Sequence, residues 1–107
     1  MIAIPLYGSE SVFELCDEAS IIFADFCDEE GYGTLDLERW GCNPNIRQIV
    51  VSGWTVEMEP GDICENFEVD LRNEDQFRDA YAKAAELYNS FCPVNKKIPV
   101  IWDELKI

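Results

Sequence analysis

The chain has 107 residues, of which 48% are hydrophobic and 12% aromatic, more apolar material than an acidic disordered tail carries. Length and composition therefore predict one folded acidic domain over residues 1–107. Its 22 acidic residues outnumber its 8 basic residues and give a net charge of −14, which excludes nucleic acid and anionic membranes as expected partners. This charge instead favours encounter with a basic surface.

The first predicted elements are an edge strand and a helix. The first seven residues are apolar and include a proline, which is typical of a strand at a sheet edge. Ser11 and Glu14 form a capping box, and apolar residues then recur at helical spacing until Gly31. We therefore expect a helix over residues 11–30, with one apolar face packed inward.

A β-hairpin is predicted at the centre of the chain. Residues 46–51 and 54–59 are separated by a Ser-Gly pair, which is typical of a two-residue hairpin turn. This register would set Val51 opposite Trp54. The residues that it places on the core face are Ile49, Val51, Trp54, Val56 and Met58.

Three further short strands are expected. They lie at residues 32–40, 67–71 and 98–102, where apolar residues alternate with polar ones or form short runs. Pro99 within the last strand is typical of a sheet edge.

A second helix is predicted between Asn73 and Pro93. Asn73 with Gln76 provides an N-cap, and the acidic residues of the first turn suit the helix dipole. Its apolar stripe consists of Phe77, Ala80, Tyr81, Ala84, Leu87, Tyr88 and Phe91. Together the elements predict an α+β fold, in which an antiparallel sheet of about four to six strands carries two helices in the order β-α-β-β-β-β-α-β.

The cysteines predict free thiols in a reducing cytoplasm. Their number is odd, no CxxC pair occurs, and the N-terminal segment lacks the features of a signal peptide. No apolar run approaches the roughly 20 residues that span a bilayer. The five residues are Cys16, Cys27, Cys42, Cys64 and Cys92.

The sequence lacks the common motifs of catalytic and cofactor-binding sites. The chain contains no histidine, which removes Ser-His and Cys-His nucleophile pairs. Glycine motifs that cradle phosphates do not occur, and the segment from Asp28 to Asp36 fails the EF-hand spacing. Scattered cysteines without histidine make a poor zinc site. We therefore expect no catalysis, no cofactor and no metal.

The aromatic residues are expected to play two roles. On the predicted core faces, where they would pack, lie Trp54, Phe67, Phe77 and Tyr81. At the ends of elements, where a residue either supports the core or the surface or anchors an interface, lie Tyr32, Trp40 and Trp102.

The negative charge is concentrated in two blocks. Residues 1–38 contain ten acids and no base, and residues 57–75 contain eight acids and one base. Unpaired like charges on one helix face cost stability, so solubility alone explains this placement poorly. The residues predicted to bind a partner are Glu14, Asp17, Glu18, Asp25, Asp28 and Glu29 on the first helix, and Glu57, Glu59, Glu68 and Asp70, which would share a solvent face of the sheet.

Rows of carboxylates on a helix or strand have a spacing comparable to that of successive phosphates, so a basic groove that follows a nucleic-acid backbone would accept them. In size, charge and architecture, though not in any sequence motif, the chain resembles the small DNA-mimicking anti-restriction and anti-CRISPR inhibitors of phages and mobile elements. This resemblance implies stoichiometric occlusion of a basic site on a host defence protein or ribonucleoprotein, in the host cytosol.

Two other functions remain open. An immunity protein that neutralises a basic nuclease toxin is also small and acidic, and it meets its partner through complementary charge. An acidic regulatory or assembly subunit would have the same composition. All three are binding functions without catalysis.

Overall fold

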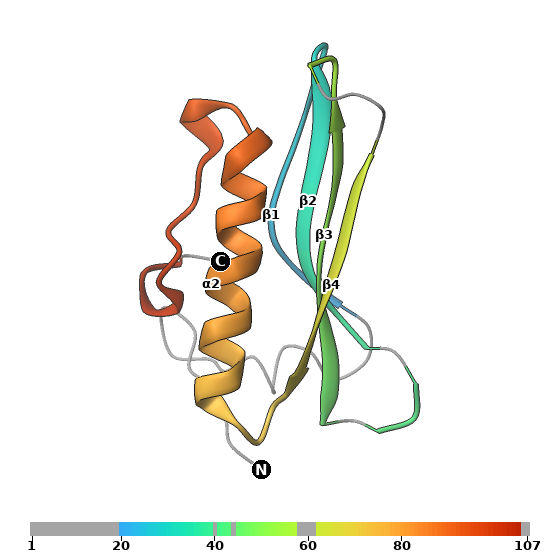
Figure 1. Cartoon of the computed structure of the whole chain (residues 1–107), viewed down its shortest axis with the longest axis vertical. Helices are drawn as coiled ribbons and strands as arrows, with labels where there is room; N and C mark the ends of the chain where they lie inside the picture. The colour runs from blue at the N-terminus through green and yellow to red at the C-terminus, as the bar shows by residue number, and fades with distance from the viewer. Residues whose placement is uncertain (1–19, 40, 44, 58–61, 106–107) are drawn as a thin grey trace.

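The computed structural model describes residues 20–39, 41–43, 45–57 and 62–105, which form one sheet, one long helix and two short 3-10 turns (Figure 1). The strands are β1 (Ser20–Asp28), β2 (Gly31–Glu38), β3 (Ile46–Thr55) and β4 (Ile63–Asp70). They are followed by the helix α2 (Glu74–Phe91) and by the turns η1 (Val94–Lys96) and η2 (Trp102–Glu104). The strand predicted over the first seven residues and the core position predicted for Met58 lie outside the described residues.

The strands form an antiparallel meander in the order β1-β2-β3-β4. In Figure 1, α2 covers one face of this sheet, and the C-terminal segment with η1 and η2 runs beside the helix. We call the face that points away from α2 the outer face. The predicted α+β class and antiparallel sheet are confirmed, but the described residues contain four strands and one main helix, so the predicted order of elements is not matched.

Strand β1 occupies a segment for which the sequence predicts a helix, so that prediction is wrong from Ser20 onward, and its first part lies outside the described residues. A β-bulge between Ile22 and Ala24 explains the misleading spacing, because Phe23 is an extra residue in β1. The bulge shifts the alternation, so that Phe23 and Phe26 both lie on the buried side. A spacing of three between buried residues is typical of a helix.

The predicted hairpin turn at Ser52 and Gly53 is also wrong, because β3 passes straight through both residues. Gly53 pairs with Gly33 of β2, and the ring of Phe91 lies over this pair. A Cβ atom would come within 2.5 Å of the ring at Gly53 and within 2.7 Å at Gly33. The two glycines therefore make room for a helix side chain, and neither forms a turn.

The unbroken strand changes which side chains reach the core. Ile49 and Val51 are buried on the α2 side, as predicted. Trp54 lies on the outer face opposite Tyr32, and Val56 lies beyond the end of β3 and is 52% exposed. The prediction that Trp54 and Val56 belong to the core is therefore wrong.

Helix α2 follows the prediction closely. The side chain of Asn73 caps it by accepting a hydrogen bond of 3.1 Å from the backbone N–H of Gln76. Leu87 and Phe91 of the predicted stripe are partly buried against the core. The buried helix residues are Phe77, Ala80, Tyr81, Ala84, Ala85 and Tyr88.

The strand predicted at residues 98–102 is wrong, since this segment packs along α2 without joining the sheet. Helix side chains bind its backbone. The Tyr81 hydroxyl donates to the carbonyl of Pro99 at 2.7 Å. The Asn89 side chain donates to the carbonyl of Ile98 at 2.8 Å and accepts from the N–H of the same residue at 2.9 Å. These contacts replace the strand partner that the pattern predicts.

Trp102 at η2 completes the core beside α2. It is 2% exposed, and its ring centroid lies 5.2 Å from that of Phe23, 4.8 Å from that of Phe77 and 5.2 Å from that of Tyr81. The structure thus places Trp102 in the core, and the alternative of an interface anchor is wrong. Tyr32 is 42% exposed, and Trp40 lies outside the described residues.

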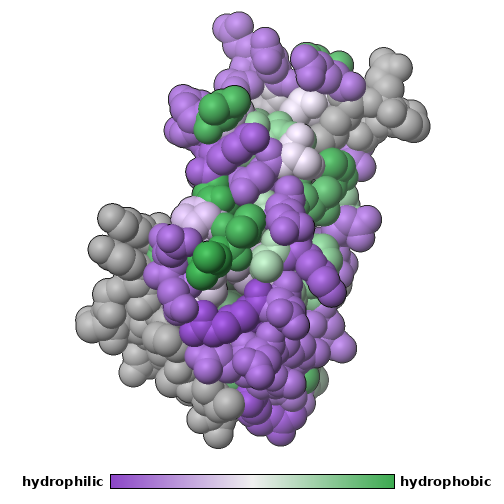
Figure 2. All heavy atoms as spheres, turned by 60° about the vertical axis from the view of Figure 1, so that its left-hand side comes forward, coloured by the Kyte–Doolittle hydropathy of each residue, from purple (hydrophilic) through white to green (hydrophobic). Residues whose placement is uncertain are grey.

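Figure 2 shows the side of the molecule formed by α2 and the C-terminal segment. Apolar side chains form a band across its middle, and hydrophilic side chains dominate both ends. Within the described residues, no helix combines the length and the apolar character that crossing a membrane requires.

Candidate partner-binding surface

The charged strand residues on the outer face of the sheet are all acidic in the described part of the chain. The strand registers place five acids there, and among the described strand residues of this face there is no base. Arg47 of β3 lies on the α2 side instead, opposite Val69, and is buried. The five acids are Asp25 on β1, Asp36 and Glu38 on β2, and Glu68 and Asp70 on β4.

Asp36 and Glu38 are neighbours on this face, at the C-terminal end of β2. They are two residues apart on β2 and therefore point to the same side. Burial, together with the hydrogen bond to Glu38 and its negative charge, raises the pKa of Asp36 from 3.8 to about 7. The Asp36 carboxyl therefore keeps its proton up to about neutral pH.

Replacing Asp36 with asparagine is expected to stabilise the protein at high pH. The folded protein keeps the Asp36 proton that the unfolded chain releases near pH 3.8, so stability falls as the pH rises from there to about 7. The full shift corresponds to about 4 kcal/mol, which partial exposure of the carboxyl reduces to about 1–2 kcal/mol. Asparagine removes this loss because it does not ionise.

The measurement is the melting temperature of both proteins at about pH 5, within the range over which stability falls, and at about pH 8, above that range. The wild type should lose more stability between the two values than Asp36→Asn does. Glu104→Gln, at an exposed carboxylate of η2, is the control and should behave like the wild type. Equal losses in the wild type and Asp36→Asn would contradict the buried proton.

Asp70 is neutralised within the chain. Its carboxylate accepts hydrogen bonds from Nε of Arg72 at 2.9 Å and from Nη2 at 2.7 Å, and from the Arg72 backbone N–H at 2.9 Å. The hydrogen bonds and charge of Arg72 lower the pKa of Asp70 to about 2. Of the two predicted site residues on β4, Glu68 is therefore the better candidate for meeting an external base.

A second group of acids gathers at one end of the sheet. We call Asp28, Glu29, Glu30 and Glu57 the acidic end. The Asp28 carboxylate accepts a hydrogen bond of 2.8 Å from the backbone N–H of Glu30, which shapes the turn between β1 and β2. The backbone N–H of Val56 donates to the carbonyl of Glu30 at 2.8 Å. This bond joins the turn to the end of β3, where Glu57 lies.

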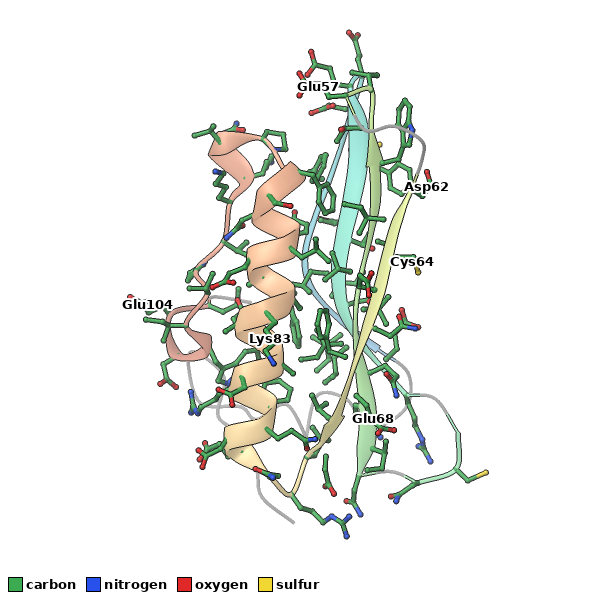
Figure 3. The ribbon with its side chains drawn as sticks, viewed as in Figure 1. Glu57, Asp62, Cys64, Glu68, Lys83 and Glu104 are labelled. Carbon is green, nitrogen blue, oxygen red and sulfur yellow. The ribbon has the colours of Figure 1, made fainter. Side chains whose placement is uncertain are left out.

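The structure separates the predicted residues into different places. Figure 3 shows Glu57 at one end of the sheet and Glu68 toward the other, so these two do not form one patch as predicted. Asp25, Asp28 and Glu29 lie on a strand and a turn, whereas the prediction placed them on a helix. Four predicted site residues lie outside the described residues, namely Glu14, Asp17, Glu18 and Glu59.

Three acids of the surface were missed by sequence reasoning. Asp36 and Glu38 alternate with the buried Leu35 and Leu37, and this alternation is the signal that identifies them. Glu30 has no comparable signal, because its position depends on the contact between the first turn and β3.

The cysteines are free in the described part of the chain. Cys27, Cys42 and Cys64 are exposed and Cys92 is buried, which confirms the predicted free thiols at these four positions. Cys16 lies outside the described residues. Over the same residues, no group of three or more Cys, Asp or Glu side chains is arranged to hold a metal ion.

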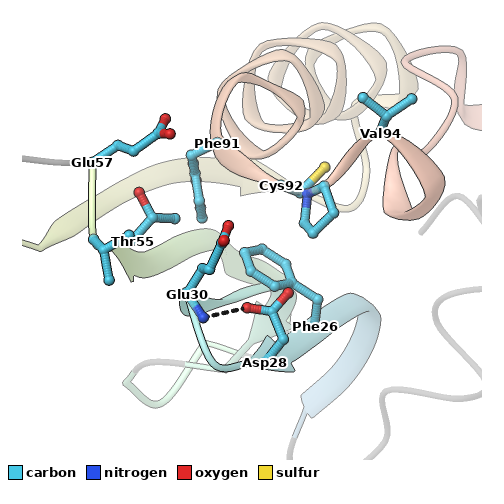
Figure 4. A pocket seen from close by; sticks show the side chains of 10 residues that line it. Phe26, Asp28, Glu30, Thr55, Glu57, Phe91, Cys92 and Val94 are labelled. Atoms are coloured by element: carbon cyan, nitrogen blue, oxygen red, sulfur yellow. Dashed lines mark hydrogen bonds between the residues drawn. The ribbon is translucent and has the colours of Figure 1, made fainter.

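A cleft of about 220 Å³ lies between the acidic end and the last turn of α2 (Figure 4). One side is apolar, with the rings of Phe26 and Phe91 and the side chain of Val94. The other side carries the carboxylates of Asp28, Glu30 and Glu57.

Comparison of the chain with protein-family models, with curated proteins and with solved structures gave no match.

Proposed function

We propose that the protein is a non-enzymatic, stoichiometric inhibitor that uses its carboxylate-rich surfaces to occupy a basic nucleic-acid-binding site of a host defence complex, of the anti-CRISPR or anti-restriction type. The supporting observation is the outer face, whose described strand residues include five acids and no base. The acidic end adds further negative charge where β1 ends and after β3.

The spacing of the acids suits a site that follows a phosphate backbone. Asp36 and Glu38 are two residues apart on one strand, a separation of about 6.8 Å along it, and the Asp36 carboxyl adds its charge once the pH exceeds its pKa of about 7. Glu38 and Glu68 flank Gln48 in the same cross-strand row, two strands apart, which corresponds to about 10 Å. A groove of lysines and arginines grips nucleic acid mainly through charge and would meet a similar pattern here.

One ion pair between described residues, Arg72 with Asp70 at 2.7 Å, lies at the outer face, and the other ion pairs lie away from it. Between described residues, Arg78 pairs with Glu74 at 3.1 Å and with Asp103 at 2.9 Å, on the side of α2 and the C-terminal segment. This side has mixed charge, as an ordinary solvated surface has. The contrast favours the outer face and the acidic end as the binding surfaces.

The test is capture of the partner on the immobilised full chain, followed by competition with a short DNA duplex. We expect the captured protein to bind nucleic acid, and we expect DNA and this protein to displace each other at equimolar saturation. Association should slow as salt rises from about 50 to about 300 mM, because the charges are then screened.

Three outcomes distinguish the functions. A partner that binds DNA and this protein at the same time would overturn the proposal. A single small nuclease toxin with a blocked active site would establish the immunity function instead. A neutral partner whose association ignores salt would show that the acidic surfaces are not the interface.

A further inference from the structure

The cleft beside the acidic end has a fixed apolar wall. The rings of Phe26 and Phe91 lie 6.0 Å apart between centroids, and both contact Tyr88, with centroids 6.0 and 5.9 Å from it. Gly33 and Gly53 provide the space in which the Phe91 ring sits. Because this wall is held by core packing, the cleft exists before any ligand arrives.

The opposite wall of the cleft is negative. Asp28, Glu30 and Glu57 contribute carboxylates, and no base is among the described residues that line it. In the view of Figure 4, the Glu30 carboxylate lies between the two phenylalanine rings. The nearby Lys96 lines a neighbouring hollow with Asp25 and does not line this one.

The end of α2 adds to the negative potential. Phe91 is the last residue of the helix, and the last turn contains no basic residue. The C-terminal end of a helix dipole is negative and favours a cation nearby. A cation in the cleft would therefore meet the helix end as well as the three carboxylates.

The size and spacing select the kind of cation. A volume of about 220 Å³ is below the roughly 300–1,000 Å³ of pockets for drug-sized ligands, and suits one side chain. The carboxylates of the described residues are not arranged to surround a metal ion. A guanidinium group has five N–H donors spread over a plane, so it reaches separated carboxylates while its flat face stacks on an aromatic ring.

We propose that this cleft binds the guanidinium group of one arginine of the partner. The carboxylates of Glu30 and Glu57 accept its N–H groups, and the rings of Phe91 and Phe26 contact its face and its aliphatic stem. This inference rests on the proposed function only in that a basic partner supplies the arginine.

The test uses the isotopically labelled full chain and three small probes, observed by heteronuclear NMR. The probes are N-acetylarginine amide, N-acetyllysine amide and the neutral isostere N-acetylcitrulline amide. We expect saturable shift changes from the arginine probe, confined to the residues of the cleft, with a dissociation constant in the millimolar range. The citrulline probe should cause none.

Variants decide which groups bind the probe. Glu30→Gln with Glu57→Gln should weaken arginine binding by about tenfold or more. Phe91→Leu keeps an apolar wall but removes the ring, and should weaken binding of the arginine probe by several-fold. The matched control, Asp79→Asn with Glu86→Gln, removes two exposed charges from α2 and should leave binding unchanged. The dispersion of the amide signals reports whether each variant is folded.

Two results would overturn the inference. Equal binding of the lysine probe would show that the cleft recognises charge alone, and shifts spread over all acidic residues would show nonspecific attraction. The proposed function fails separately, through the DNA competition described above. Saturable arginine binding in the cleft with no basic partner would keep the inference and remove the function.

Discussion

Replacing Trp102 with alanine is expected to lower the free energy of unfolding by about 3–5 kcal/mol. The indole is 2% exposed and makes edge-to-face contacts with Phe23, Phe77 and Tyr81, which come from β1 and α2. Alanine would leave a cavity among these three rings, and the rigid aromatic packing cannot close it fully. A loss of this size is a large fraction of the roughly 5–15 kcal/mol that stabilises a typical domain.

Urea unfolding followed by circular dichroism measures this change. With a slope of about 1–3 kcal/mol per molar urea, the midpoint should fall by about 2 M. Ile101→Ala is the control, because this neighbouring residue is 56% exposed and its truncation should cost less than about 1 kcal/mol. Similar losses in the two variants would mean that the C-terminal segment is not anchored through Trp102.

The packing of Trp102 also helps to position one wall of the cleft. The segment between α2 and Trp102 includes Val94, which contributes to the apolar wall. Hydrogen bonds from Tyr81 and Asn89 to Pro99 and Ile98 hold the middle of this segment on the helix. Partial release of the segment in Trp102→Ala should therefore weaken arginine binding as well as stability, although Trp102 does not line the cleft.

Local signals in the sequence were sufficient for some elements. The cap of Asn73 and the long apolar stripe define α2, because the helix buries a single continuous face. The alternation around Leu35 and Val69 defines β2 and the second half of β4, since one face of each strand packs against the helix, whereas residues 63–66 of β4 were not predicted as a strand. In these elements the local pattern and the tertiary packing agree.

Other elements depend on contacts between distant residues. The bulge at Phe23 gives the buried residues of β1 a helix-like spacing, and the ring of this residue packs on Trp102, far along the chain. Ser52 and Gly53 resemble a hairpin turn, but the glycine is required by the Phe91 ring. Neither contact can be inferred from the neighbouring residues alone.

One part of the candidate surface can be predicted from local sequence, and the other part depends on contacts between distant residues. The outer-face acids Asp36 and Glu38 follow from strand alternation. The acidic end requires the β1–β2 turn to lie beside the end of β3, a contact made through the backbones of Glu30 and Val56. Charge content predicted that an acidic surface exists, whereas its location needed the order and register of the strands.

Reversing charges at the acidic end is expected to weaken partner binding by about 100-fold, which corresponds to about 2.7 kcal/mol. The variant is Glu29→Lys with Glu57→Lys, and both residues are exposed. Lysines there would face the lysines and arginines of the partner, and like charges brought together in an interface cost several kcal/mol. Asp28 is left unchanged because its carboxylate shapes the turn through the Glu30 N–H.

Two further double variants separate local contact from overall charge, since each changes the net charge of −14 by the same amount. Asp25→Lys with Glu68→Lys alters the outer face and should also weaken binding strongly. Asp79→Lys with Glu86→Lys alters exposed positions of α2 and should weaken it by less than about tenfold, through long-range steering alone.

Salt distinguishes the two effects in the same binding assay. Raising the ionic strength toward about 1 M shortens the screening length to about 3 Å, which removes steering but leaves direct contacts. The control variant should then bind like the wild type, while the acidic-end variant should remain weaker. If all three variants weaken binding equally and salt abolishes every difference, the charge acts only at long range, and neither surface contacts the partner.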